Sequence, residues 1–190
     1  MRTGRIERKT AETGILVEVN LDGTGTYDVS TGIGFLDHMV EQFSRHSLID
    51  VALKVQGDLH IDQHHTTEDS AIALGQALKQ ALGERRGIAR YGFVLPMDEA
   101  RATVSIDLSG RPYPVFEGSF DTPFIGDYRT DLTAHVFRSL AEHLGAAIHV
   151  SVTGDDDHHK TEAVYKAFGR ALRQAIRIEG DAVPSTKGVL

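Results

Sequence analysis

The sequence predicts an α+β fold made of two similar halves related by a pseudo-twofold axis, each a mostly antiparallel sheet with helices on one face. Three observations support this prediction: the chain aligns with itself, apolar residues alternate in several short segments, and the segments between them carry apolar residues at helical spacing. Neither half has enough apolar residues for a core of its own. We therefore expect residues 1–190 to form a single domain.

The strands are predicted by matching alternation in the two halves. Residues 12–23 align with residues 99–110, and in both segments every second residue is apolar. This period is typical of a strand with one buried face. Further strands are expected at 49–55 and 146–152, and shorter ones near 26–30 and 113–117. Each half is thus expected to run strand, strand, helix, strand, helix.

The helices also match between the halves. Residues 35–46 align with residues 132–143, which places His38 opposite His135. A second helix in each half begins at a histidine pair and continues with apolar residues at helical spacing. The halves span about 8–90 and 91–180, the tail is 181–190, and the second half carries an insertion around Phe116–Thr130.

Composition and charge exclude several classes of function. The chain has 27 acidic against 20 basic residues and a net charge of -7, which argues against a nucleic-acid partner or an anionic membrane surface. It has no cysteine, so any metal must be bound through nitrogen and oxygen. The charged N-terminus does not resemble a secretory signal, and no apolar run is long enough to span a membrane. We expect a cytoplasmic protein.

The motif H-H-x-x-E occurs twice, as His64 to Glu68 and as His158 to Glu162. On a helix, residues i, i+1 and i+4 lie at about 0°, 100° and 40° around the axis, so the motif directs two imidazoles and a carboxylate to one side. One such motif is equally consistent with a solvated helix start that places an acid near the helix dipole. Two copies at equivalent points of a repeat favour metal binding by Mn, Fe, Zn, Co or Ni.

His38 and His135 extend this set to six histidines and two glutamates, enough for two metals with open positions. Neighbouring histidines on a helix point about 100° apart, so His64 and His65 are expected to serve different metals, as are His158 and His159. Packing of His38 against Phe35 is the alternative, and the match with His135 argues against it. His46 and His143 also align, and a structural role for them stays as open as a functional one.

Two other features have less specific interpretations. Glu12 and Glu99 precede the first predicted strand of each half, where an acid can simply be a strand-edge charge. The C-terminal V-P-S-T-K-G-V-L offers a hydroxyl and an ammonium group to a phosphate, but it also suits a frayed tail. The chain contains neither a P-loop nor a dinucleotide-binding glycine motif.

A series of motifs resembles the imidazoleglycerol-phosphate dehydratase family. In order, these motifs are T-A-E-T, L-D-G-T-G, T-G-I-G-F-L-D-H-M, D-L-H-I-D-Q-H-H-T-T-E-D, D-L-S-G-R-P-Y, D-H-H-K-T-E and P-S-T-K-G-V-L. The resemblance covers about Arg8 to Leu190 and is to the monofunctional form, because the chain has no room for the phosphatase domain fused to this enzyme in some bacteria.

The resemblance implies a hydro-lyase of histidine biosynthesis. The implied reaction converts D-erythro-imidazole-glycerol phosphate to imidazole-acetol phosphate and water at a site with two Mn2+ ions, which stabilise an imidazolate. The resemblance assigns one metal to His38, His65, His158 and Glu162, and the other to His64, Glu68, His135 and His159. The internal repeat exchanges these two sets, which supports the grouping.

The resemblance also implies residues that contact the phosphorylated imidazole substrate. It places Glu12 at the substrate as acid/base and His46 beside it as a further catalytic residue; the implied substrate-binding residues are Gln42, Arg90, Arg111, Ser185 and Lys187. It further implies a homo-24-mer of octahedral symmetry with active sites between subunits. Two residues depart from the family pattern: Asp156 stands where Asn is usual, and Tyr165 where Phe is common.

Two other functions fit part of the pattern. A dinuclear metal-dependent phosphohydrolase would use the same ligands, and an assay separates it because a dehydratase leaves the phosphate on its product. A metal-storage or metal-sensing protein would explain the histidines but not the Arg, Ser and Lys set, and such a protein would bind no phosphorylated imidazole.

Overall fold

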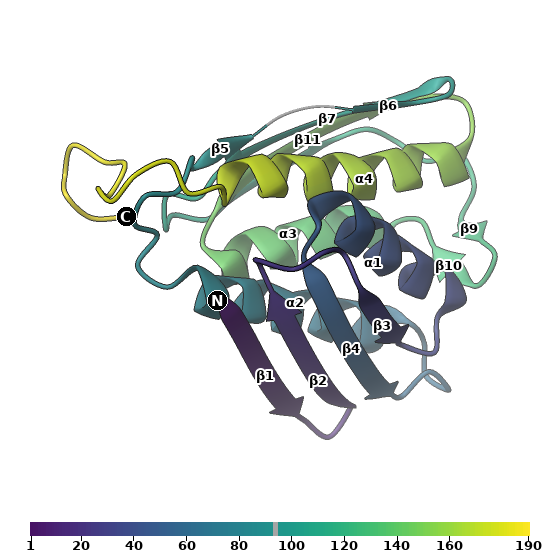
Figure 1. The fold of residues 1–190 in the computed structure, drawn as a ribbon. Helices are drawn as coiled ribbons and strands as arrows, with labels where there is room; N and C mark the ends of the chain where they lie inside the picture. The colour runs from purple at the N-terminus through teal and green to yellow at the C-terminus, as the bar shows by residue number, and fades with distance from the viewer. Residues whose placement is uncertain (93–94) are drawn as a thin grey trace.

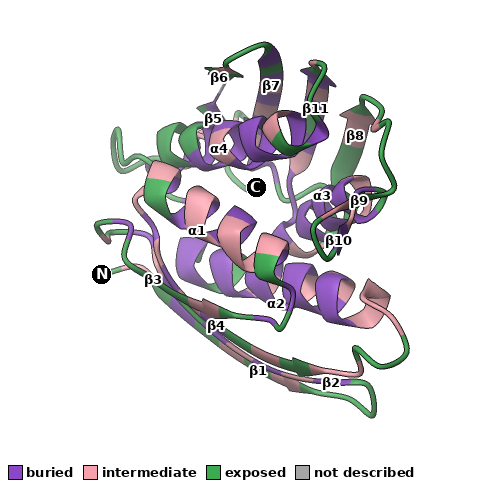
Figure 2. Cartoon of the chain, turned by 90° about the vertical axis from the view of Figure 1, so that its right-hand side faces the viewer, coloured by how far each residue is buried: buried purple, intermediate pink, exposed green. Residues whose placement is uncertain are grey.

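The computed structural model describes residues 1–92 and 95–190. In this part of the chain, four helices lie between two sheets (Figures 1 and 2). The outer faces of both sheets carry exposed and half-buried residues, and the inner faces are buried against the helices (Figure 2). None of the described helices is both long and apolar enough to cross a bilayer.

Each half contains the predicted order of strand, strand, helix, strand, helix, together with strands that were not predicted. The first half contains β1 (Thr3–Lys9), β2 (Thr13–Asn20), β3 (Tyr27–Ser30), α1 (Gly34–Ser47), β4 (Asp50–Gly57) and α2 (His64–Leu82). The second contains β5 (Tyr91–Gly92), β6 (Leu95–Met97), β7 (Ala100–Asp107), β8 (Tyr113–Glu117), β9 (Phe124–Ile125), β10 (Tyr128–Arg129), α3 (Leu132–Leu144), β11 (Ala147–Thr153) and α4 (Asp157–Ala175).

Both sheets have the same topology, which confirms the predicted duplication and fold class. The first has the order β1-β2-β4-β3, and in the second β5 and β6 pair with β7, which is followed by β11 and β8. β1, β2 and β4 are antiparallel, as are their counterparts, whereas β3 runs parallel to β4 and β8 runs parallel to β11. Each sheet is therefore mostly antiparallel, as predicted.

The first strands of each sheet were not predicted: β1 in the first half, and β5 and β6 in the second. β1 has a single large apolar residue, Ile6, set among charged residues such as Arg5, so it lacks the alternation that marks a half-buried strand. The neighbouring strand β2 stabilises β1, because Arg5 Nε of β1 donates to Glu18 Oε1 of β2 at 2.9 Å. Gly4 lets α2 approach β1 closely, since a Cβ there would lie 2.1 Å from Ala77 O.

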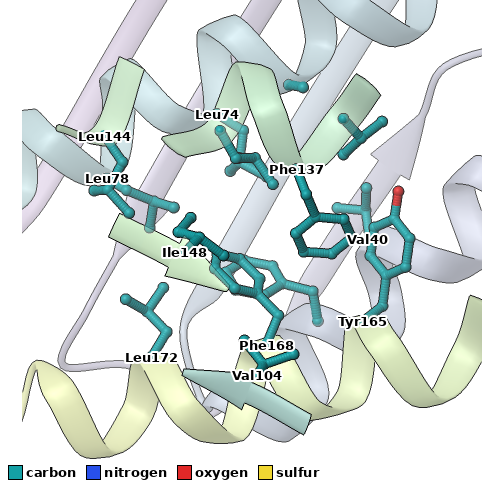
Figure 3. Close-up of a cluster of buried hydrophobic side chains, with 14 of the residues drawn as sticks. Val40, Leu74, Leu78, Val104, Phe137, Leu144, Ile148, Tyr165, Phe168 and Leu172 are labelled. Carbon is teal, nitrogen blue, oxygen red and sulfur yellow. The ribbon is translucent and has the colours of Figure 1, made fainter. Parts of the chain in front are cut away.

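The core joins the two halves through their helices. α1 packs against α4 and α2 packs against α3, so each helix of one half faces a helix of the other. Phe43 of α1 stacks on Phe168 of α4 with ring centroids 5.3 Å apart. Phe137 of α3 meets the Phe168 ring edge-on at 5.4 Å, and Figure 3 shows these two rings. This packing places α1 beside α4 and α2 beside α3, although the helices of each pair belong to different halves of the sequence.

The insertion of the second half forms a small hairpin. Between β8 and α3 the chain makes β9 and β10, which pair with each other, whereas a few residues link β3 to α1 in the first half. The hairpin lies beside α1 at the edge of the helical layer (Figure 1). It is the largest departure from the repeat among the described residues.

Candidate metal centres and substrate site

One cluster of metal-binding side chains lies where α1 and α4 meet. It contains His38 from α1 and His158 and Glu162 from α4, and one ligand atom from each lies within 4.8 Å of the others. Glu162 is buried, and its Oε2 lies 3.3 Å from His158 Nε2. We call this group the α1–α4 cluster.

A second cluster lies where α2 and α3 meet. It contains His64 and Glu68 from α2 and His135 from α3, again with ligand atoms within 4.8 Å of one another. Glu68 lies between the histidines, with Oε2 3.4 Å from His64 Nε2 and Oε1 3.1 Å from His135 Nε2. This α2–α3 cluster is the repeat counterpart of the first, because the repeat exchanges α1 with α3 and α2 with α4.

The donor atoms of both clusters fit a divalent cation. Two imidazole nitrogens and a carboxylate suit Mn, Fe, Zn, Co or Ni. The Nε2 atom of His135 is buried and makes no hydrogen bond, although it faces the Glu68 carboxylate. A buried nitrogen without a partner is costly, and a bound cation would satisfy it.

His65 and His159, which the sequence assigned to these metals, lie in neither cluster. The ring of each is nearly perpendicular to that of its neighbour: the ring planes of His64 and His65 make an angle of 83°, and those of His158 and His159 make an angle of 89°. Within one chain, each predicted set of four ligands is brought together only as three.

Carboxylates instead hold the Nδ1 atoms of His65 and His159. His65 Nδ1 lies 3.0 Å from Asp58 Oδ2, and His159 Nδ1 lies 2.8 Å from Glu99 Oε2. The hydrogen bonds to Asp58 and Glu99 raise the pKa of His65 and His159, respectively. A carboxylate on Nδ1 is common behind a metal-binding histidine, because it leaves Nε2 free to bind.

Glu12 and Glu99 occupy equivalent positions in the repeat but differ in environment. Glu99 accepts the backbone N–H of Asp156 at 2.9 Å, and this bond together with His159 lowers the pKa of Glu99 to about 2. Glu12 is 52% exposed, and its Oε1 lies 3.6 Å from His65 Nε2. Glu99 is therefore held as an ionised acceptor, whereas Glu12 faces solvent beside a histidine.

Gln42 and His46 follow His38 on α1, about one and two turns further along the helix. The pKa of His46 is lowered by burial and by the positive charges of Lys166 and Arg170 on α4. Sequence reasoning missed Lys166, whose Nζ lies 2.7 Å from Glu162 Oε1. Its position one turn after Glu162 was the available signal.

The four residues predicted to hold a phosphate surround one hollow. Arg90, Arg111, Ser185 and Lys187 line an open space of about 500 Å³. The Arg90 guanidinium binds the Asp107 carboxylate and donates to Pro184 O at 2.9 Å, which ties the C-terminal segment to the end of β7. The hollow is thus lined by three basic side chains. Neither the two clusters nor Glu12, Gln42 and His46 are among the residues that line it.

The two residues that depart from the family pattern, Asp156 and Tyr165, have defined contacts in the structure. Asp156 is the N-cap of α4, and its side chain accepts the backbone N–H of His159 at 3.1 Å. Asn caps helices equally well, so the substitution changes charge but not the cap. Tyr165 is buried, with its ring 5.2 Å from that of Phe137 (Figure 3).

A sequence model of the imidazoleglycerol-phosphate dehydratase family matches residues 31–172, which include all eight predicted metal ligands. The chain belongs to the imidazoleglycerol-phosphate dehydratase family. It is a hydro-lyase that dehydrates D-erythro-imidazole-glycerol phosphate to imidazole-acetol phosphate in histidine biosynthesis.

Relatives in the imidazoleglycerol-phosphate dehydratase family match over the whole chain. The enzyme of Erythrobacter litoralis is 61% identical, covering 100% of this chain and 99% of its own, and that of Methanosarcina barkeri is 51% identical with 100% of both chains covered. A bifunctional histidine biosynthesis protein of Actinobacillus pleuropneumoniae is 52% identical, and this chain spans 52% of its length. The resemblance to the monofunctional form is confirmed.

Solved structures of imidazoleglycerol-phosphate dehydratases have the same fold. The Staphylococcus aureus enzyme has a TM-score of 0.84 at 33% identity, covering 93% of this chain and 99% of its own. The Pyrococcus furiosus enzyme, crystallised with a ligand, has a TM-score of 0.84 at 34% identity, covering 97% of this chain and 100% of its own.

Proposed function

We propose that this dehydration takes place at two Mn2+ ions held between two copies of the chain. One copy supplies the α1–α4 cluster and the other supplies the α2–α3 cluster. The missing fourth ligand of each metal is then His65 or His159 of the opposite copy. This arrangement is supported by the two histidines themselves, whose Nδ1 atoms are held by carboxylates and which lie outside both clusters of their own chain.

Such a site requires at least two copies of the chain, because the cluster of one kind on one copy meets the cluster of the other kind on its neighbour. Soluble homo-oligomers have closed symmetry in most cases. The homo-24-mer of octahedral symmetry implied by the family resemblance is the closed assembly that we propose, and we place it in the cytoplasm.

In this proposal, the bound cations stabilise charge and Glu12 transfers the proton. The bound cations would supply Lewis-acid stabilisation of negative charge on the imidazole ring of the substrate. Glu12 removes the proton from C2 of the glycerol chain and, as the acid/base, returns a proton to the departing C3 hydroxide, which leaves as water; the resulting enol becomes the ketone of imidazole-acetol phosphate. Glu12 suits this role because its carboxylate is exposed beside His65.

The phosphate end of the substrate is held by the hollow at the C-terminal segment. Arg111, Ser185 and Lys187 offer a guanidinium, a hydroxyl and an ammonium group, and Arg90 shapes the hollow through its bonds to Asp107 and Pro184. Gln42 and His46 lie beside the substrate from the other copy, next to the positive charge of Lys166.

Lys187→Ala is expected to raise KM for imidazole-glycerol phosphate by roughly tenfold or more, because a charge-assisted bond to phosphate contributes about 1.5–3 kcal/mol. The measurement is steady-state turnover at saturating Mn2+. Lys9→Ala, which removes an exposed lysine from β1, serves as the control. An unchanged KM in Lys187→Ala would exclude Lys187 from the phosphate site.

Mixing two inactive variants tests whether the active site is shared. His38→Ala damages the α1–α4 cluster and His64→Ala damages the α2–α3 cluster. After the two proteins are dissociated, mixed and reassembled, roughly one site in four pairs two undamaged clusters, so about that fraction of wild-type turnover is expected. Each variant alone, treated in the same way, is the control. A mixture without recovered activity contradicts the shared site, provided that the wild type survives the same treatment.

A further inference from the structure

The starts of α1 and α2 are held by the inserted segment (Phe116–Thr130) rather than by their own N-cap side chains. Ile33 precedes α1 and has no side chain that can cap it. Asp127 of the insertion replaces the cap, because its Oδ2 accepts the N–H of Gly34 at 3.0 Å and its Oδ1 accepts that of Phe35 at 3.4 Å. An acid at this position also meets the positive end of the helix dipole.

The same hairpin holds the start of α2. The residue before His64 is Gln63, whose side-chain amide donates to Asp127 O and whose Oε1 accepts the N–H of Arg129 at 3.0 Å. The Arg129 guanidinium also lies 3.1 Å from Asp62 Oδ2. One short hairpin thus joins the helix that carries His38 to the helix that carries His64 and Glu68.

The other end of the inserted segment holds the start of α4. Asp157, which directly precedes His158, accepts the backbone N–H of Asp121 at 2.9 Å and that of Thr122 at 2.7 Å. Lys160 donates to Ser119 O at 3.0 Å. The side chains of Asp157 and Lys160 are almost fully buried, so these bonds are shielded from water.

We propose that the inserted segment is the element that positions the two metal clusters of one chain relative to each other, and that Asp127 is its main positioning residue. Metal ligands must be held within a few tenths of an ångström, so a helix start that shifts carries its ligands out of place. The first half of the repeat contains no such segment of its own. The insertion is therefore not part of the repeated unit, but it contacts three of the helices that carry the clusters.

This inference rests on the proposed two-metal site. Because each chain contributes its two clusters to two different active sites, a fixed spacing between the clusters also fixes one active site relative to the next. Asp127 touches neither metal ligands nor substrate in this role. It acts through the backbone of α1 and through Gln63.

The test compares Asp127→Ala and Asp127→Asn with Asp121→Ala. Asp121 lies in the same segment, but its side chain is 77% exposed and pairs with Lys160, and its replacement by Ala keeps the backbone N–H that Asp157 accepts. The readouts are Mn2+ stoichiometry and affinity by equilibrium dialysis, the Mn2+ EPR spectrum, and thermal unfolding of the metal-free oligomer.

We expect Asp127→Ala to bind Mn2+ about tenfold or more weakly at both clusters, with an altered EPR spectrum, while Asp121→Ala matches the wild type. Asp127→Asn, which keeps one acceptor oxygen and the shape of the side chain, is expected to lie between them and is decisive if the alanine variant does not assemble. Wild-type Mn2+ affinity in the Asp127 variants would overturn the proposal, even with a lower unfolding temperature. A wild-type protein that binds no Mn2+ would instead overturn the proposed function.

Discussion

His135→Ala is expected to remove one of the two Mn2+ ions per chain and to lower kcat about a thousandfold. His135 is the ligand whose Nε2 is buried without a hydrogen bond and faces Glu68, so its loss leaves the α2–α3 cluster with two donors. A Lewis acid contributes several kcal/mol to a transition state, and each 1.36 kcal/mol corresponds to a factor of ten in rate. Metal content per chain and turnover at saturating substrate are the measurements.

His143→Ala is the matched control for this prediction. His143 lies about two turns further along α3, and its Nδ1 lies 2.9 Å from Ser139 O rather than near a carboxylate of the cluster. We expect this variant to keep both ions. Two tightly bound ions in His135→Ala would show that His135 is not a metal ligand.

Glu12→Gln is expected to keep both metal ions and to lower kcat about 10²- to 10⁴-fold, the usual contribution of a general base. The amide has nearly the same shape as the carboxylate but cannot take up the C2 proton. Turnover and exchange of the C2 hydrogen, followed with substrate deuterated at C2, are measured together with metal content. Loss of exchange with full metal content separates a failure of proton transfer from a failure of metal binding.

Glu7→Gln provides the control for Glu12→Gln. Glu7 is a surface carboxylate on β1 whose side chain is 72% exposed, and it lies 3.7 Å from Arg5. We expect its substitution to leave both turnover and exchange unchanged. Wild-type exchange and turnover in Glu12→Gln would require another residue as the acid/base.

The sequence predicted much of the fold because the relevant signals are local. Alternation in β2 and β7 and helical spacing in α1 and α3 depend on residues within a few positions of each other. The repeat then connected the two halves and revealed the insertion. β1 was not predicted because this charged edge strand has no alternation of apolar residues and is stabilised by its neighbours in the sheet.

The sequence also predicted the histidines and glutamates that the structure brings together in the two clusters. These follow from helix geometry and from the spacing of H-H-x-x-E. Lys166 was missed, because its relevance depends on an ion pair with Glu162 that spacing alone does not distinguish from a solvated pair.

By itself, the sequence determined the duplicated α+β fold, the histidines and glutamates of the two clusters and the helices that carry them, since each depends on short-range periodicity. Only the tertiary structure decided that His38 meets α4, that His64 meets α3, and that His65 and His159 are held by carboxylates outside both clusters. It also showed that the insertion holds the starts of three helices. These contacts join residues far apart in the chain, and they depend on how the helices of the two halves pack.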